Sequence, residues 1–264
     1  MNILEKIVAQ KKLEVAERWS QVPVKQLEQS VYFSAPTQSL KKSLQDKNKS
    51  GIITEFKRQS PSKGIIHAQA TVETVTSGYG QAGASALSIL TDSNFFGGSN
   101  ADLLTARKLN FCPILRKDFT IDEYQLIEAK AIGADAILLI AAILQPKQII
   151  LLSDFAHSLG LEVLLEVHSH QELDPSFFSH VDLIGVNNRD LKTFEVNTDL
   201  SKKLSSFIPS EIIKISESGI SKPETIVELK KYGFEGFLIG ENFMKESRPE
   251  VAAAEFITKL KSLS

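Results

Sequence analysis

Residues 113–143 read PILRKDFTIDEYQLIEAKAIGADAILLIAAI. Two short apolar runs, 113–119 and 136–143, enclose the longer amphipathic segment 122–134. Short runs of this kind are typical of buried strands, and an amphipathic segment of this length is typical of a helix. Gly133, which is followed by alanine, is the glycine expected just past the end of that helix. The stretch therefore predicts a strand–helix–strand unit.

The same alternation continues along the chain after Gly51. Near-continuous hydrophobicity is typical of parallel strands covered on both faces, so the repeated runs and helices predict an α/β protein with a closed (β/α)8 TIM barrel. A doubly wound open sheet is the alternative that the pattern leaves open. The predicted strands are 52–57, 86–92, 113–119, 136–143, 162–169, 183–190, 212–220 and 236–244.

We interpret residues 1–264 as a single domain, with an N-terminal helical extension at 1–50 and the barrel at 51–264. Residues 1–19 have charges at helical spacing among apolar residues, which indicates an amphipathic helix rather than a signal peptide. A helix that covers the barrel bottom and one that folds over a substrate have the same pattern. The sequence leaves these two positions of the extension open.

Composition excludes several classes of partner. The formal charge is −2, from 30 basic and 32 acidic residues, which gives no reason to expect nucleic acid or a membrane surface. Cys112 is the single cysteine, so an intramolecular disulfide is excluded, and its position at the start of an apolar run indicates packing. No apolar run reaches the roughly 18 residues of a membrane span. We expect a soluble, cytoplasmic protein.

Polar side chains gather where the predicted strands end, which is where parallel barrels carry their functional groups. Glu55 and Lys57 are two residues apart and therefore share one face of a strand. A structural ion pair would explain this pair alone. Several charges at one barrel mouth, however, would each cost several kcal/mol in desolvation unless paired or used, which favours function. The other strand ends supply Lys117, Asp118, Glu166, Asn187, Asn188, Arg189, Glu217, Ser218, Glu241 and Asn242.

Two further features suggest the kind of substrate. The loops 216–221 and 238–243 follow the seventh and eighth strands, where barrels commonly bind phosphate with backbone N–H groups, and Ser60 and Arg189 could approach them. Phe95, Phe96 and Phe119 lie near the same mouth and could form a wall for an aromatic ring. His168 and His170 lack a third ligand of matching kind, so we expect no metal.

Seven stretches together make the chain resemble the indole-3-glycerol phosphate synthase family of (β/α)8 enzymes. The resemblance implies a carboxy-lyase of tryptophan biosynthesis that needs no cofactor. Its substrate, 1-(2-carboxyphenylamino)-1-deoxyribulose 5-phosphate, would undergo ring closure with loss of CO2 and water. The matching stretches are EFKRQSPSKG, AGASALSILTDSNFFGGS, ILRKDFTIDEYQLIEAKAIGADAILLIAA, LGLEVLLEVHS, LIGVNNRDLKTFEVN, ISESGIS and FLIGENFM, in order between residues 55 and 244.

The resemblance also implies roles for individual residues. Lys117 matches the general acid of ring closure, and Glu166 and Lys57 match groups of the later steps, with their division of labour open. Glu55 and Asn187 would position the ribulose hydroxyls, and Glu217 would support the lysines; Ser218 is placed with the catalytic groups as well as with the phosphate. The phosphate positions are Ser60, Arg189, Ser218, Gly219, Gly240 and Glu241, and the ring pocket is Phe96 and Phe119.

Two other functions compete with this interpretation. A related ribulose-phosphate isomerase barrel would be expected to use a cysteine or an aspartate pair, and Cys112 sits at the wrong end of its strand for that. A non-enzymatic barrel that serves as a partner subunit is the other possibility. We expect a monomer, while a homodimer or association with other tryptophan-pathway enzymes remains open.

Overall fold

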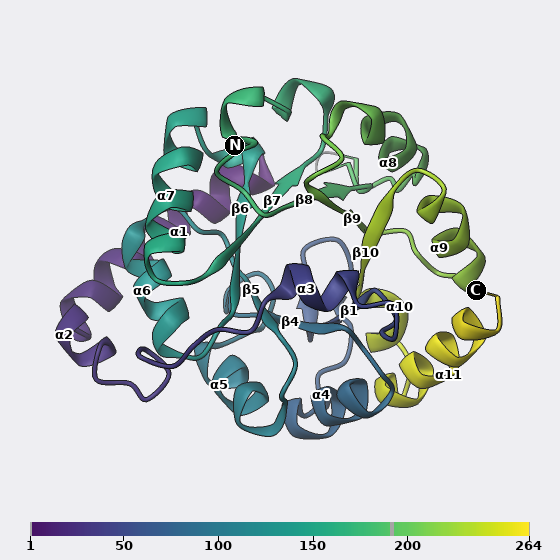
Figure 1. Ribbon diagram of the computed structural model, residues 1–264. Coiled ribbons are helices and arrows are strands. Elements are labelled where there is room, and N and C mark those ends of the chain that lie inside the picture. The colour runs from purple at the N-terminus through teal and green to yellow at the C-terminus, as the bar shows by residue number, and fades with distance from the viewer. Residues whose placement is uncertain (1, 191–192, 264) are drawn as a thin grey trace.

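The computed structural model describes residues 2–190 and 193–263 and shows a closed barrel of parallel strands (Figure 1). Around the ring the strands follow the order β1-β10-β9-β8-β7-β6-β5-β4. Their bounds are β1 Ile52–Phe56, β4 Ala86–Leu90, β5 Ile114–Lys117, β6 Ala136–Ile140, β7 Glu162–Val167, β8 Leu183–Asn187, β9 Ile213–Glu217 and β10 Phe234–Ile239. The closed barrel is therefore confirmed, and the open sheet is excluded. Residues 191–192, inside the matching stretch 183–197, lie outside the described residues, as do the chain ends included in the 1–264 domain.

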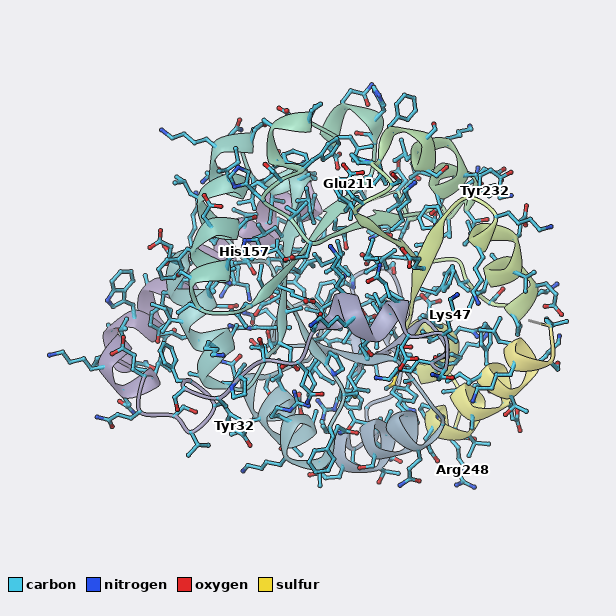
Figure 2. The ribbon with its side chains drawn as sticks, viewed as in Figure 1. Tyr32, Lys47, His157, Glu211, Tyr232 and Arg248 are labelled. Atoms are coloured by element: carbon cyan, nitrogen blue, oxygen red, sulfur yellow. The ribbon has the colours of Figure 1, made fainter. Side chains whose placement is uncertain are left out.

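Helices surround the barrel on its outer side (Figure 1). Side chains fill the ring itself, while the labelled Tyr32, Tyr232 and Arg248 lie at its periphery (Figure 2). None of the described helices is long and apolar enough to cross a membrane. The helices after β1 are α4 Val72–Gln81, α5 Asn100–Leu109, α6 Glu123–Ala131, α7 Pro146–Ser158, α8 Asp199–Leu204, α9 Pro223–Lys230, α10 Glu241–Met244 and α11 Pro249–Ser262.

The alternation of side chains along each strand separates two apolar layers. On β1, Ile52 and Phe56 pack outward against the surrounding helices, and Ile53 packs inside the barrel. Cys112 packs against the outer layer, and burial raises the pKa of its thiol. Because Glu55 has the parity of Ile53, the alternation directs this carboxylate into the barrel.

Local signals explain where the helix of the 113–143 stretch begins and ends. The side chain of Asp122 accepts a hydrogen bond from the backbone N–H of Tyr124 at the start of α6. Gly133 follows with φ of 87°, a left-handed conformation that favours glycine, and the chain turns directly into β6. The predicted strand–helix–strand unit is therefore confirmed.

Every predicted strand extends past its observed carboxyl end. Residues 141–143, predicted as strand, form a short 3-10 turn, and residues 241–244 form the helix α10. Polar residues just past the observed strand ends belong to the loops instead. Asp92, after β4, is an example, because its side chain accepts hydrogen bonds from the backbone N–H groups of Phe95 and Phe96. Near the first strand, residues 59–60 and 64–65 form a small antiparallel hairpin, β2 Gln59–Ser60 and β3 Gly64–Ile65.

The N-terminal extension covers both ends of the barrel. Helix α1 (Ile3–Gln21) lies behind the ring in Figure 1, and α3 (Leu40–Gln45) crosses its near side; the short α2 (Val24–Leu27) lies outside, beside α6. The Ser43 hydroxyl of α3 donates to the carbonyl of Ser85, just before β4 begins, so α3 closes the bottom. Ile3, Leu4 and Ile7 of α1 line a pocket at the opposite end. The two positions that the sequence left open are thus both occupied, by different helices.

Candidate functional site

A pocket of about 490 Å³ opens where the strands of the barrel end. The residues to which the resemblance gave a role all line it, although they come from loops and strands spread over most of the chain, whereas Asn188 and Phe95 do not line it. The predicted residues in its wall are Glu55, Lys57, Ser60, Phe96, Lys117, Phe119, Glu166, Asn187, Arg189, Glu217, Ser218, Gly219, Gly240 and Glu241. The fold therefore brings these residues together in one pocket.

Glu55 and Lys57 form an ion pair in the pocket wall, with 2.6 Å between Lys57 Nζ and Glu55 Oε1. Burial would raise the pKa of Glu55, but Lys57 and Lys117 together lower it below its usual value. Arg58 has the opposite parity: its guanidinium lies over the Phe56 ring and pairs with Asp102 on α5. At this strand end, Glu55 and Lys57 therefore point into the barrel, while Arg58 points outward and forms an ion pair with α5.

Gly240 makes room for this ion pair. A Cβ atom at position 240 would clash with the Glu55 side chain, both at Oε1 and at Cβ. Gly185 has the same relation to Glu217, because its Cβ would meet Glu217 Oε1. Gly185 on β8 and Gly240, directly after β10, therefore stand where the neighbouring strand places a carboxylate.

We expect the substitution Gly240→Ala to lower kcat by about tenfold or more, because the added methyl group would displace the Glu55–Lys57 ion pair from its place in the pocket wall. Steady-state kinetics and thermal unfolding would be measured together. The matched control is the double variant Gly240→Ala/Glu55→Ala, in which the clashing carboxylate is absent and thermal stability should recover. A Gly240→Ala variant with unchanged kcat would mean that the position of Glu55 does not matter for turnover.

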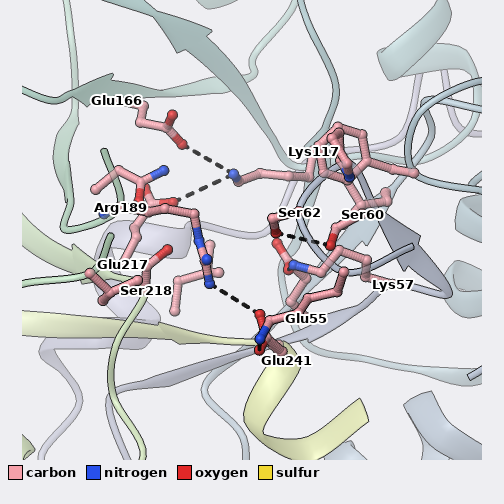
Figure 3. A pocket seen from close by; sticks show the side chains of 18 of the residues that line it. Glu55, Lys57, Ser60, Ser62, Lys117, Glu166, Arg189, Glu217, Ser218 and Glu241 are labelled. Carbon is pink, nitrogen blue, oxygen red and sulfur yellow. Dashed lines mark hydrogen bonds and ion pairs between the residues drawn. The ribbon is translucent and has the colours of Figure 1, made fainter. Parts of the chain in front are cut away.

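Lys117 lies at the centre of the site. Its Nζ is 3.1 Å from Glu166 Oε2 and 3.5 Å from Glu217 Oε2 (Figure 3). Burial would lower the pKa of Lys117, but the charges on Glu166, Glu217 and Glu55 raise it above its usual value. The lysine is therefore an ammonium ion at neutral pH, with a proton to donate.

The two carboxyl groups around Lys117 differ in their protonation. Burial raises the pKa of Glu217 to about 8 even though Lys117 opposes the shift. Glu166 is also buried, but Lys117 and His168 lower the pKa of this carboxyl well below its usual range. Separated pKa values of this kind distinguish acids from bases in a site. At neutral pH, Glu166 is an anion, and Glu217 is mostly a neutral acid.

His168 is a site residue that the sequence reasoning missed. Its Nε2 is 3.2 Å from Glu166 Oε1, and its Nδ1 is 3.5 Å from Glu172 Oε2. Burial would lower the pKa of His168, but these carboxylates raise it to about 10, so the ring is cationic at neutral pH. The sequence carried the signal, because Glu166 and His168 are two residues apart at a strand end. From the sequence alone, this histidine is weighed only as a metal ligand.

The described residues include no group of three or more histidine, cysteine, aspartate or glutamate side chains that could hold a metal ion. His170, the other histidine considered for this purpose, instead packs its ring edgewise on Phe207, with 4.2 Å between the centroids.

At one side of the pocket, cationic and small residues meet. Arg189 Nη2 lies 3.0 Å from Glu241 Oε2 (Figure 3), and Lys63 Nζ lies 3.6 Å from Glu241 Oε1. Ser218 and Gly219 both have positive φ, which for serine is uncommon and turns this loop sharply after β9. The Asn188 amide donates to the carbonyls of Glu217 and Ser218 and holds the loop in that shape. Asn188 therefore supports the site, whereas its neighbour Asn187 lines it.

The other side of the pocket is apolar. Phe96 and Phe119 face each other with 5.7 Å between their ring centroids. Phe95 packs against the same inner apolar layer but does not line the pocket. Ile3, Leu4 and Ile7 of α1 complete the wall. These three residues could not be singled out from the sequence, because periodicity does not say which surface a helix contacts.

Comparisons with known proteins show the family of the chain and support its fold. A family model described as indole-3-glycerol phosphate synthase matches residues 4–256. An indole-3-glycerol phosphate synthase from Bacteroides thetaiotaomicron is 49% identical over 256 residues, which cover 97% of this chain and 98% of the relative. One from Acinetobacter baylyi is 42% identical over 255 residues, covering 96% and 95%. Among solved structures, a tryptophan synthase alpha-subunit mutant from Pyrococcus furiosus has a TM-score of 0.60 and 15% identity, covering 81% of this chain and 98% of its own, and supports the fold alone.

Proposed function

The chain belongs to the indole-3-glycerol phosphate synthase family, and from this membership we propose which of its residues carry the reaction. The reaction closes an indole ring from 1-(2-carboxyphenylamino)-1-deoxyribulose 5-phosphate and releases CO2 and water. When the substrate carboxyl is ionised, each turnover also consumes one proton. The observation that carries the assignment is the position of Lys117, whose ammonium lies between the carboxyl groups of Glu166 and Glu217, with an apolar wall on one side of the pocket and cationic residues on the other.

Lys117 is the general acid of ring closure in this proposal. The ring carbon that bears the carboxyl group attacks the ribulose ketone, and negative charge develops on the ketone oxygen. Lys117 donates its proton to that oxygen, which becomes a hydroxyl. The raised pKa of Lys117 keeps the proton in place until the charge develops, and the anionic Glu166 fixes the direction of the ammonium.

The later steps need an acid and a base. Loss of CO2 restores the aromatic ring; the new hydroxyl then leaves as water, and a neighbouring proton is removed. Glu166 is the base in this proposal, because it is an anion at neutral pH and can accept a proton. The contacts of Lys57 favour a separate role, since it pairs with Glu55 rather than with Glu166. We assign Lys57 to protonation of the leaving hydroxyl, and Glu55 and Asn187 to the ribulose hydroxyls.

The two sides of the pocket would fix the ends of the substrate. The carboxyphenyl ring would lie against Phe96 and Phe119. The phosphate would bind Ser60, Arg189 and the backbone N–H groups of the loops containing Ser218, Gly219, Gly240 and Glu241. We further propose that the reaction takes place in the cytoplasm, with a monomeric enzyme as the simplest assembly and association with other tryptophan-pathway enzymes as an open alternative.

The direct test mixes the purified protein with the anilino-ribulose phosphate substrate and follows indole fluorescence. We expect fluorescence to grow with time and with enzyme concentration, and to be absent with heat-denatured protein. Phosphoribosylanthranilate serves as the second substrate, because an isomerase would convert it and this enzyme should not. Folded protein that converts neither compound, and that fails to rescue a tryptophan auxotroph, would contradict the proposal and favour a partner subunit.

A further inference from the structure

The N-terminal helix carries a buried lysine that contacts three carboxylates. Lys11 Nζ is 2.7 Å from Glu14 Oε2, 2.9 Å from Asp92 Oδ2 and 2.9 Å from Asp118 Oδ1, and its side chain is only 1% exposed. Glu14 belongs to the same helix, while Asp92 follows β4 and Asp118 follows β5. One ammonium ion thus joins α1 to the ends of two barrel strands.

Each barrel carboxylate also holds the backbone of an aromatic residue. Asp92 Oδ1 accepts hydrogen bonds from the N–H groups of Phe95, at 2.8 Å, and Phe96, at 3.3 Å. Asp118 Oδ1, the atom that contacts Lys11, accepts one from the N–H of Phe119, at 2.8 Å. Lys11 is therefore linked through Asp92 and Asp118 to the backbone N–H groups of Phe96 and Phe119, whose rings form the apolar wall.

The remaining contacts of the cluster fasten the same parts together. Glu14 Oε1 accepts a hydrogen bond from the side-chain amide of Asn94, which ties α1 to the loop of Phe96 a second time. Asp118 Oδ2 accepts from the Thr91 hydroxyl and pairs with Arg116. Only one turn of helix separates Lys11 from Ile7, which lines the pocket with Ile3 and Leu4.

A buried ion cluster is a costly means of stabilising a fold. Apolar residues of similar volume are often as good or better, whereas charges in fixed geometry can select one arrangement of the surrounding elements. Here the elements that the cluster joins are the ones that carry the apolar wall of the pocket, namely Phe96, Phe119 and the pocket-lining residues of α1. We propose that Lys11 is a positioning residue that sets the ring pocket around the carboxyphenyl group of the substrate. This proposal rests on the proposed function and adds to it a residue outside the pocket wall.

The test compares Lys11→Met with Lys12→Met, a matched control because Lys12 is the exposed neighbour on the same helix. For Lys11→Met we expect KM to rise about tenfold or more, as for other losses of fit in an apolar pocket, while kcat changes by less than about threefold. Lys11→Arg, which keeps the charge, should recover most of the affinity. Lys12→Met should match the unmodified enzyme in both constants.

Two binding measurements separate positioning from general damage. Binding of N-carboxymethyl anthranilate, which has the ring without the phosphate, should weaken in Lys11→Met, and binding of inorganic phosphate should not. If Lys11→Met does not fold, Asn94→Ala tests the same connection, because it removes the hydrogen bond between Asn94 and Glu14 of α1. This variant should bind N-carboxymethyl anthranilate more weakly and inorganic phosphate as before. Equal loss of both ligands, or no loss of either, would overturn the proposal. Failure of the proposed function would instead appear as inactivity of the unmodified enzyme.

Discussion

Substitution of Lys117 by methionine is expected to reduce kcat by on the order of 10² or more and to change KM little. Methionine keeps most of the length and apolar volume of the lysine stem but has no proton to donate. Because general acid catalysis contributes about 10²–10⁴ in rate, loss of the donor should appear in kcat. The measurement is indole fluorescence under saturating substrate, with circular dichroism to show that the barrel is intact.

The expected result depends on the charges around Lys117. Removing the ammonium leaves Glu166 with His168 as its remaining close cation, and burial should then raise the pKa of Glu166. The comparison variant is Lys57→Met, which removes a lysine from the same pocket but leaves Glu166 paired with Lys117. If Lys117→Met retained the unmodified kcat, the general acid would have to be another group, and Lys57 would be the first to test.

The barrel could be predicted well from the sequence because the burial of apolar side chains, which stabilises it most, leaves a pattern within each short segment. Apolar runs flanked by helix-ending glycines such as Gly133 are repeated along the chain, and burial on both faces requires them. The same logic overestimated the strand ends. Residues such as Asp92 follow the apolar run directly, but their side chains bond to loop backbone, and a hydrophobic pattern alone does not distinguish the two.

Most residues of the candidate site could also be predicted from the pattern of strands. Charged residues at strand ends are unusual enough to mark Lys117 and Glu166, and strand parity directs Glu55 inward. The positions of these residues in the pocket agree with the prediction, while their roles stay proposals. The contribution of α1 could not be predicted, because Lys11 and Asp118 are far apart in sequence and only the folded chain brings them together.

The sequence alone also could not predict that the pKa of Glu166 is lowered while the pKa of Glu217 is raised. Both are glutamates near the carboxyl ends of barrel strands, Glu166 on β7 and Glu217 on β9 with β8 between them, and both are buried. The difference lies in their partners: Glu166 has Lys117 and His168 close by, whereas Glu217 has Lys117 at a longer distance and two neighbouring carboxylates. Burial therefore outweighs pairing at Glu217 and not at Glu166.

The substitution Glu217→Gln should accordingly stabilise the protein, and more so as the pH rises. In the folded chain the pKa of Glu217 is about 8, against an ordinary value of 4.5, so between these values folding takes up a proton. Stability of the unmodified protein therefore falls as pH rises from about 4.5 to 8, and glutamine, which does not ionise, removes that slope. The expected gain at pH 8 is on the order of 1–3 kcal/mol in the free energy of unfolding.

Urea unfolding of both proteins at several pH values between 4.5 and 9 would measure this gain, with Glu211→Gln as the control because Glu211 is exposed. The control should show no pH-dependent gain. In the kinetics, a limb of the kcat profile near pH 8 that belongs to Glu217 should be absent from the glutamine variant. If Glu217→Gln were less stable than the unmodified protein at pH 8, the attraction to Lys117 would outweigh burial, and Glu217 would be an anion during turnover. The carboxyl group would then act beside Glu166 as a second counter-ion of the general acid rather than as a neutral neighbour.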